Sequence, residues 1–262
     1  KISEYFLLVI TTLMGMDFMI SSGDFLMMYI GLELATIPIA ALAAFERFSS
    51  KSAEAGIKLI LTSALSSGVL LFGLSFIYGT TGSIYYADIA PQVAVNPLQT
   101  LGFIFFTAGM AFKISLVPFH LWTADVYEGA PVNVTSYLSV ISKGAASFTF
   151  LIILYKVFGE LLAVWQPLLY TLALATMTIG NLFAMRQDNF KRFLAFSSIA
   201  QAGFILLGIL QAGNLGSTSV VYFVLIYVFT NLAVFGVVSA VSHATGKENI
   251  SDYKSFYLTN PR

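Results

Sequence analysis

The chain has 262 residues, of which 58% are hydrophobic and only 10% charged, and its formal net charge is zero. Charged residues make up about a quarter of an ordinary soluble domain, so this composition indicates a membrane protein. The sequence has no cysteine, which excludes disulfides, thiolate chemistry and iron–sulfur ligation in these residues. Its two histidines are far apart, so a histidine-based metal site is not expected. Neither a dinucleotide fingerprint nor a P-loop is present, and nucleotide binding has no support.

Long apolar runs separated by helix breakers predict about eight transmembrane helices, so the expected fold class is an all-α polytopic membrane protein. The predicted spans are Ser3–Ser21, Asp24–Phe45, Ala53–Tyr78, Leu98–Val126, Pro131–Lys156, Trp165–Met185, Phe190–Leu210 and Leu215–His243. Within the fourth span, Pro118 lacks an amide hydrogen and crowds the preceding turn, so the helix should break beside it. The connection Gly79–Pro97 carries aromatic residues and is expected to lie in the membrane interface.

Lysine and arginine residues of the connections gather on one predicted side of the membrane. That side holds Lys1, Arg47, Lys51, Arg186, Lys191, Arg192, Lys247, Lys254 and Arg262. The other side has only Lys156. The positive-inside rule therefore places both ends of this chain in the cytoplasm, and an even number of spans requires the same arrangement.

Three ionisable residues, Glu33, Lys113 and Lys143, fall near the middle of predicted spans. Lys113 lies about 20 Å along its helix from Leu98, which is near the centre of a hydrocarbon layer roughly 30 Å thick. A charge at that depth costs ~2.5–3.5 kcal/mol on insertion scales, so each residue is a candidate functional group. A lysine held between desolvation and a nearby carboxylate can change protonation, as a proton relay requires. The alternative is a structural ion pair between helices.

The helix around Lys143 carries Ser136, Ser139 and Ser147 at steps of three and four residues. These residues share one helix face with the lysine. Such a face could hold a chain of water molecules, which favours a proton path. Small residues that let helices pack closely are the alternative explanation for the serines.

Other polar residues carry weaker predictions. His120 follows the expected break, where it is a possible proton relay or a partner for freed backbone carbonyls. Lys58 lies one turn inside its span and is expected to reach the cytoplasmic surface. Asp125 and Glu128 are expected to be loop or cap groups. The polar turn at residues 187–192 is expected to be solvated.

The run KISLVPFHLWTADVYEGAPVNVTSYLSVISKGA resembles the signature of the antiporter-like membrane subunits of respiratory complex I. Within that family, PFHLW followed by DVYEGAP and SK is similar to the N subunits, whereas the related L and M subunits usually show a histidine-containing pattern in place of ISK. GLELATIPIAAL, EAGIKLILTSALSSGVLLFG and NFKRFLAFSSIAQAGF resemble further family segments. The resemblance extends from about Tyr29 to about Phe204.

The resemblance implies roles for individual residues. Glu33 matches the carboxylate that pairs with the central lysine, Lys113 matches the lysine of the broken helix, and Lys143 matches the lysine that connects toward the membrane axis. Two positions depart from the family pattern. Ala124 stands where proline is common, and Gln201 replaces a frequent histidine, which puts a proton role at that position in doubt.

The resemblance also implies an architecture of inverted five-helix repeats, each with its own broken helix. Residues 1–156 would form the first repeat, with one half-channel. Residues 157–262 would supply three helices of the second repeat and a cytoplasmic tail. The chain starts at Lys1 without a methionine, so a fragment is expected, with the second broken helix beyond Arg262.

The function that the resemblance implies is that of a proton-translocating membrane subunit of an NADH–quinone oxidoreductase. Its expected partners are other membrane subunits, the lipid bilayer and protons, with no nucleic acid, in the inner membrane of a bacterium. No cofactor is expected in this chain, while NADH, FMN, iron–sulfur clusters and quinone would belong to other subunits. Two alternatives remain open: a subunit of a multi-subunit Na⁺/H⁺ antiporter or membrane-bound hydrogenase of the same superfamily, and a helical scaffold that transports nothing.

Overall fold

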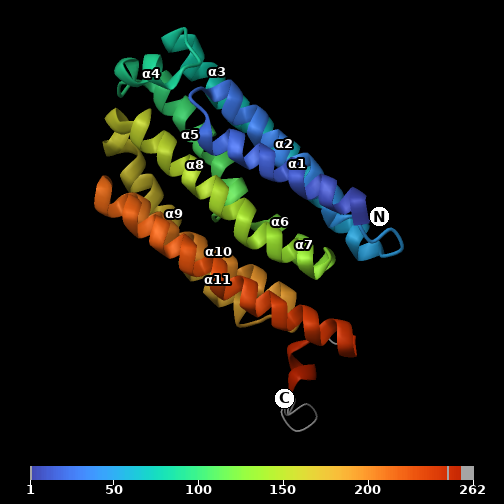
Figure 1. Cartoon of the computed structure of the whole chain (residues 1–262). Coiled ribbons are helices and arrows are strands. Elements are labelled where there is room, and N and C mark those ends of the chain that lie inside the picture. Colours follow the sequence, from blue (N-terminus) through green and yellow to red (C-terminus); the bar gives the residue numbers. More distant parts are fainter. Residues whose placement is uncertain (1, 247, 255–262) are drawn as a thin grey trace.

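The computed structural model of the chain describes residues 2–246 and 248–254, and these residues form a bundle of long helices (Figure 1). Eight helical segments are long and apolar enough to cross a membrane. The prediction of an all-α polytopic protein with eight spans is therefore confirmed. Lys1, Lys247 and Arg262, which contributed to the predicted orientation, lie outside the described residues.

The first half of the chain contains helices α1 to α6. Their bounds are α1 Ile2–Ser21, α2 Phe25–Ala43, α3 Ser50–Thr81, α4 Tyr86–Ile89, α5 Pro97–Ile114 and α6 Leu121–Gly129. The long helices begin after polar caps: the side chains of Asp24, Ser49 and Asn96 each accept a hydrogen bond from a backbone N–H of the first turn. Such caps satisfy donors that have no partner within the helix. The short helix α4 lies in the connection that was predicted to be interfacial.

The second half begins with a span that is not uniformly α-helical. It consists of α7 Val132–Tyr137, a π-helical turn at Leu138–Ser142, and α8 Lys143–Lys156. The remaining spans are α9 Leu162–Ala184, α10 Phe190–Leu210 and α11 Asn214–Thr245. The π-helical turn immediately precedes Lys143, and turns of this kind occur frequently at functional sites.

Helix α5 breaks where the sequence predicts. It ends at Ile114, and α6 begins at Leu121. Ser115, which is fully buried, adopts the left-handed conformation with φ of 68°. The freed backbone groups find new partners: the indole of Trp122 donates to the carbonyl of Phe112 at 3.1 Å, and Val117 N donates to Thr176 Oγ1 at 3.1 Å. These bonds make an irregular backbone tolerable at membrane depth.

Close helix contacts hold the break in place. Gly73 of α3 and Gly102 of α5 face each other, since a Cβ built on Gly73 would lie 2.6 Å from the carbonyl oxygen of Gly102, and the reverse distance is 2.8 Å. Only glycine allows the two backbones to approach this closely. Helix α3 is thereby fixed against α5, which carries Lys113 in its last turn.

The segment after α11 folds back onto the turn between α9 and α10. Phe190 N donates to Glu248 O at 2.9 Å, and Ile250 N donates to Asp188 O at 2.8 Å. Lys191 is 6% exposed and forms an ion pair with Glu248 at 3.3 Å. The prediction that the whole 187–192 turn is solvated was wrong for Lys191, because the folded-back segment covers this lysine.

Candidate functional site

Lys113 lies between α5, α2 and α3. Its Nζ donates a hydrogen bond to Thr36 Oγ1 of α2 at 2.5 Å. A small enclosed cavity of about 10 Å³ adjoins the ammonium, with hydroxyls contributed by Thr36, Ser63, Ser66 and Ser67. A cavity of this volume, measured to the centre of a water-sized sphere, is about the space of one water molecule. The lysine therefore has a hydroxyl partner and, beside it, a mostly apolar cavity with room for about one water.

Glu33 lies on α2, three residues before Thr36 and thus on the same helix face. Its carboxylate acts electrostatically on Lys113, but no ion pair within 4.0 Å joins the two residues in the described part of the chain. Glu33 Oε1 is buried and has no hydrogen-bond partner there. The expected direct pairing with the central lysine is thus not formed in this structure, where Thr36 takes the contact.

His120 lies directly before α6 and is 7% exposed. Its ring interacts with the backbone of Pro118, as expected for a residue that satisfies a freed carbonyl. Its Nδ1 is buried without a partner among the described residues. No contact joins it to Lys113 or Lys143 in the part of the chain described, so its possible relay role stays a prediction.

Lys143 lies on the opposite side of the α5–α8 contact and faces α10. It is 2% exposed, and its Nζ donates to the carbonyl oxygen of Ser198 at 3.1 Å and to Ser198 Oγ at 2.9 Å. The π-helical turn before Lys143 rotates the side chains that follow it around the helix axis. Lys143 therefore lies among hydroxyl and carbonyl groups of a neighbouring helix, whereas Lys113 has a carboxylate within electrostatic range.

The serine face of the Lys143 helix is only partly directed at the ammonium. Ser147 Oγ donates to the carbonyl of Lys143 itself at 2.8 Å, one turn along the same helix. Ser139 Oγ lies 3.1 Å from the hydroxyl of Tyr227 on α11. The hydroxyl that contacts the ammonium belongs to Ser198 on another helix, which the face pattern did not predict.

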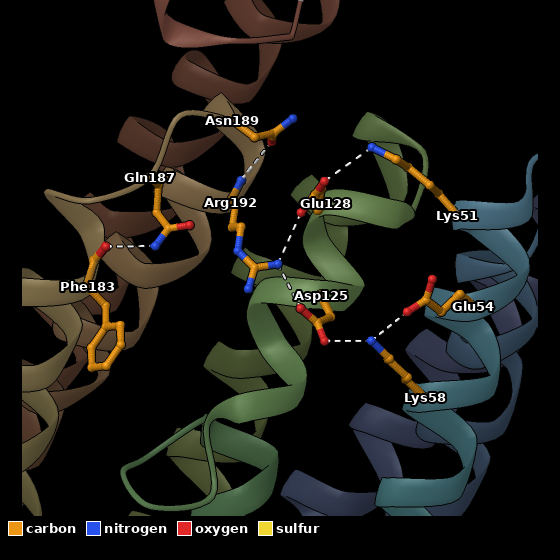
Figure 2. Close-up of polar contacts among 9 residues, drawn as sticks. All are labelled: Lys51, Glu54, Lys58, Asp125, Glu128, Phe183, Gln187, Asn189 and Arg192. Atoms are coloured by element: carbon orange, nitrogen blue, oxygen red, sulfur yellow. Dashed lines mark hydrogen bonds and ion pairs between the residues drawn. The ribbon is translucent and has the colours of Figure 1, made fainter.

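A network of six charged residues lies at the end of the bundle where α3 begins (Figure 2). Its ion pairs are Lys51–Glu128 at 3.2 Å, Lys58–Glu54 at 2.6 Å, Lys58–Asp125 at 2.7 Å, Arg192–Asp125 at 2.7 Å and Arg192–Glu128 at 3.1 Å. The network joins α3, α6 and α10 with three cations and three anions, so it fixes the helix that follows the break.

This network was not predicted from the sequence. Asp125 and Glu128 were expected to be loop or cap groups and Arg192 to be solvated, but the structure pairs all three. The spacings offered a partial signal, because Glu54 and Lys58 are four residues apart and Asp125 and Glu128 are three apart. The contacts between helices required the folded structure.

Glu128 lies beyond the membrane-spanning segments, and its titration reflects this network. Burial raises the pKa of the Glu128 carboxyl, but hydrogen bonds and charges from Arg192 and Lys51 outweigh burial and hold the net pKa below its ordinary value. The carboxylate form is therefore the one that the folded network favours.

The described residues contain no group of three or more histidine, cysteine, aspartate or glutamate side chains that could hold a metal ion. Their chemistry is that of a membrane bundle with buried lysines, a carboxylate and hydroxyls around a broken helix. This arrangement defines the class of antiporter-like membrane proteins.

Comparison with known proteins gives the same class. The family described as "NADH:quinone oxidoreductase/Mrp antiporter, TM" matches residues 22–262, and the chain belongs to this family. An NADH-quinone oxidoreductase subunit N of Azobacteroides pseudotrichonymphae is 56% identical, covering 98% of this chain and 54% of the relative. The subunit N of Phocaeicola vulgatus is 52% identical, covering 100% of this chain and 56% of the relative. The chain thus spans about half the length of these curated relatives.

Solved structures show the same fold. A chain of respiratory complex I from Thermus thermophilus, solved with bound aureothin, is 34% identical with a TM-score of 0.78, covering 90% of this chain and 51% of that chain. A chain of an archaeal membrane-bound sulfane sulfur reductase is 29% identical with a TM-score of 0.86, covering 94% of this chain and 51% of that chain. The predicted resemblance to antiporter-like subunits is confirmed.

Proposed function

We propose that this chain is the proton-conducting part of an N-type membrane subunit of an NADH–quinone oxidoreductase. The observation that carries the proposal is the placement of two buried lysines: Lys113 at the end of the first half of the broken helix, and Lys143 on the next membrane span. Both have polar partners rather than direct anions, which suits groups that gain and lose protons. The curated relatives named as subunit N support this assignment over other members of the family.

In the proposed mechanism, Lys113 takes up a proton while the carboxylate of Glu33 stabilises its ammonium form. Thr36 holds the ammonium, and a water in the adjoining cavity gives it a second hydrogen-bond partner. When Lys113 releases its proton, Lys143 becomes protonated deeper in the bundle. Arginine could not replace either lysine, because it does not release its proton at physiological pH. His120 is a further candidate relay.

The chain itself does no redox chemistry in this proposal. NADH, FMN, iron–sulfur clusters and quinone belong to other subunits, and the partners of this chain are neighbouring membrane subunits and lipid. The excess of lysine and arginine in the connections of one side supports a cytoplasmic location for both ends of the chain in a bacterium. Residues 1–156 form the first repeat, and residues 157–262 belong to the second.

Structural similarity also extends to a chain of the Mrp complex of Dietzia sp., which is 25% identical with a TM-score of 0.83, covering 90% of this chain and 44% of that chain. The fold is therefore common to several transport complexes. Subunit N relatives at 56% and 52% identity favour the oxidoreductase over a sodium/proton antiporter.

The test compares Lys143→Ala with Lys156→Ala, which removes an exposed lysine from the end of the same helix. Each variant is placed in the full-length subunit of the assembled oxidoreductase. NADH oxidation and proton uptake are then measured in inverted membrane vesicles. We expect Lys143→Ala to reduce pumping on the order of a hundredfold, as for loss of a proton-transfer group, and Lys156→Ala to leave it unchanged. Normal pumping by an assembled Lys143→Ala variant would support the scaffold alternative.

A further inference from the structure

Among the described residues, one side chain that is hydrogen-bonded to Lys143 can accept its proton and pass a proton on. No ion pair within 4.0 Å in the described residues includes Lys143. Its ammonium donates to the carbonyl oxygen and the hydroxyl of Ser198. A backbone carbonyl accepts a hydrogen bond but has no proton of its own to pass on, whereas a hydroxyl both accepts and donates. Ser198 Oγ is therefore the group through which a proton can leave.

Hydroxyls from other helices surround that exit. The Tyr227 hydroxyl of α11 lies 3.1 Å from Ser139 Oγ and donates to the carbonyl of Ser139 at 3.4 Å. It is also near Ser198, although no hydrogen bond within 3.5 Å joins Tyr227 and Ser198 among the described residues. The hydroxyl of Tyr127 on α6 is also near Ser139 and Ser198, but it has no hydrogen-bond partner in the described structure. Tyr227 is 5% exposed, and Ser198, Ser139 and Tyr127 are at most 1% exposed. A buried hydroxyl is costly unless it is hydrogen-bonded, so a cluster from four elements is not an accident of packing.

Tyr227 also borders a groove between α10 and α11 whose lining is mostly apolar but includes several polar side chains. The groove has a volume of about 250 Å³, and its polar lining consists of Ser197, Gln201, Tyr227, Thr230 and Asn231. Tyr227, Thr230 and Asn231 lie near the middle of α11, which is 32 residues long. Uncharged polar side chains inside membrane helices commonly hydrogen-bond to neighbouring helices, and beside a groove they can also bind water. Tyr227 is thus in contact with the lysine cluster on one side and with the groove on the other.

We propose that Ser198 and Tyr227 form a hydroxyl relay that carries the proton of Lys143 into the groove between α10 and α11. The inference rests on the proposed function, and it adds a route and a destination. In the step, the ammonium of Lys143 gives a proton to Ser198 Oγ, and Ser198 passes its own hydroxyl proton to Tyr227 Oη. Tyr227 passes its hydroxyl proton to a water in the groove. Lys143 ends neutral, the water gains one proton, and each hydroxyl keeps one.

One rearrangement is needed for this step. The hydroxyl of Ser198 donates to the carbonyl of Ala195 at 2.9 Å in the structure. It must rotate from that carbonyl toward Tyr227 before the proton can pass. The rotation involves one bond of a small side chain, so it requires no movement of the helices. Ser139 holds Tyr227 in place and accepts from it when the relay is at rest.

The test removes single oxygens from the relay. Tyr227→Phe and Ser198→Ala are placed in the full-length subunit of the assembled oxidoreductase, beside Lys143→Ala. The matched control is Tyr222→Phe, which removes the same atom from a side chain that is 69% exposed on the same helix. Proton uptake per NADH oxidised, the amount of assembled subunit and the rate ratio in H₂O and D₂O are measured in inverted vesicles.

We expect Tyr227→Phe and Ser198→Ala each to slow proton uptake by about tenfold, the rate equivalent of ~1.4 kcal/mol. We also expect the H₂O/D₂O rate ratio to rise, because proton transfer then limits the rate. A purely structural role for Tyr227 would change assembly but not this ratio. Tyr222→Phe should behave like the unaltered protein. If Tyr227→Phe fails to assemble, Ser198→Ala decides the question.

The outcomes separate this inference from the proposed function. If Lys143→Ala abolishes pumping but both relay variants pump normally, the hydroxyl relay is overturned and the proton-conducting role stands. An equal loss in Tyr222→Phe would also overturn the relay, since it would show a general sensitivity of α11. If an assembled Lys143→Ala variant pumps normally, the proposed function itself fails, and the relay fails with it.

Discussion

Lys113 and Lys143 occupy unlike surroundings within one bundle. Lys113 has the carboxylate of Glu33 within electrostatic range, one threonine partner and room for about one water. Among the described residues, Lys143 has no ion-pair partner, and its ammonium donates hydrogen bonds to Ser198. A carboxylate stabilises an ammonium in a low-dielectric site, whereas hydroxyls stabilise it less. The comparison indicates that Lys113 is suited to hold a proton and Lys143 to hand it on.

Among the substitutions that test this difference between the two lysines, Lys113→Ala should have the largest effect on proton uptake. Because Lys113 is the first buried proton carrier in the proposed path, its loss should reduce proton uptake in vesicles on the order of a hundredfold. Lys113→Arg should not restore pumping, because arginine keeps its proton. Substantial pumping by the arginine variant would show that a fixed positive charge is sufficient, and a proton-carrying role for Lys113 would then be untenable.

Glu33→Gln removes the feature that distinguishes the two lysines. We expect proton uptake to fall by about tenfold, or ~1.4 kcal/mol, while the subunit still assembles. The effect should disappear when Lys113 is already replaced, but it should add to that of Ser198→Ala, which acts at the other lysine. The pumping rates of the single and double variants provide the double-mutant cycle that tests this expectation. If Glu33→Gln lowered proton uptake by the same factor when Lys113 is already replaced, Glu33 would not act through Lys113.

Thr36 offers a finer test of the Lys113 site. Thr36→Val keeps the shape of the side chain but leaves the ammonium without its hydroxyl partner. Proton uptake should therefore fall by about tenfold, at the lower end of the ~1.5–3 kcal/mol for a hydrogen bond to a charged group. Thr36→Ser keeps the hydroxyl and serves as the matched control, with near-normal pumping expected. Equal pumping rates for Thr36→Val and Thr36→Ser would show that the Thr36 hydroxyl has no role in proton uptake.

The smallest predicted effect concerns the charged network and should leave both lysine sites intact. Arg192→Gln should lower the stability of the assembled subunit by about 1 kcal/mol or less, because its ion pairs are partly exposed. The folded-state pKa of Glu128 lies below its ordinary value, so its stabilising contribution is present above that ordinary value, about 4.3, and is lost as the pH falls through the folded-state pKa. Thermal denaturation at neutral and acidic pH should show the difference between the two proteins shrinking on acidification.

The sequence was sufficient to predict the spans and the break. Helix α10, Phe190–Leu210, has the bounds that its apolar run predicts. The break follows from the chemistry of Pro118, although the left-handed conformation of Ser115 has no signal in the sequence. Local patterns of this kind depend on a few neighbouring residues, so they can be read without knowledge of the fold.

The partners of the buried lysines could not be predicted in the same way. Ser198 is 55 residues from Lys143, and Thr36 is 77 residues from Lys113. Such contacts depend on which helices pack together and on their rotation, which the π-helical turn before Lys143 changes further. The serine face of that helix predicted a wet path along one element, whereas the contacts in the structure lead to α10 and α11.

We propose that this chain moves protons through its buried lysines rather than serving as a scaffold. This proposal is tested by the number of protons translocated per NADH oxidised by the purified oxidoreductase in sealed proteoliposomes, with Lys113 and Lys143 both replaced by alanine. We expect a lower ratio than in the unaltered enzyme at equal assembly. An unchanged ratio would contradict it, because protons would then cross without either lysine.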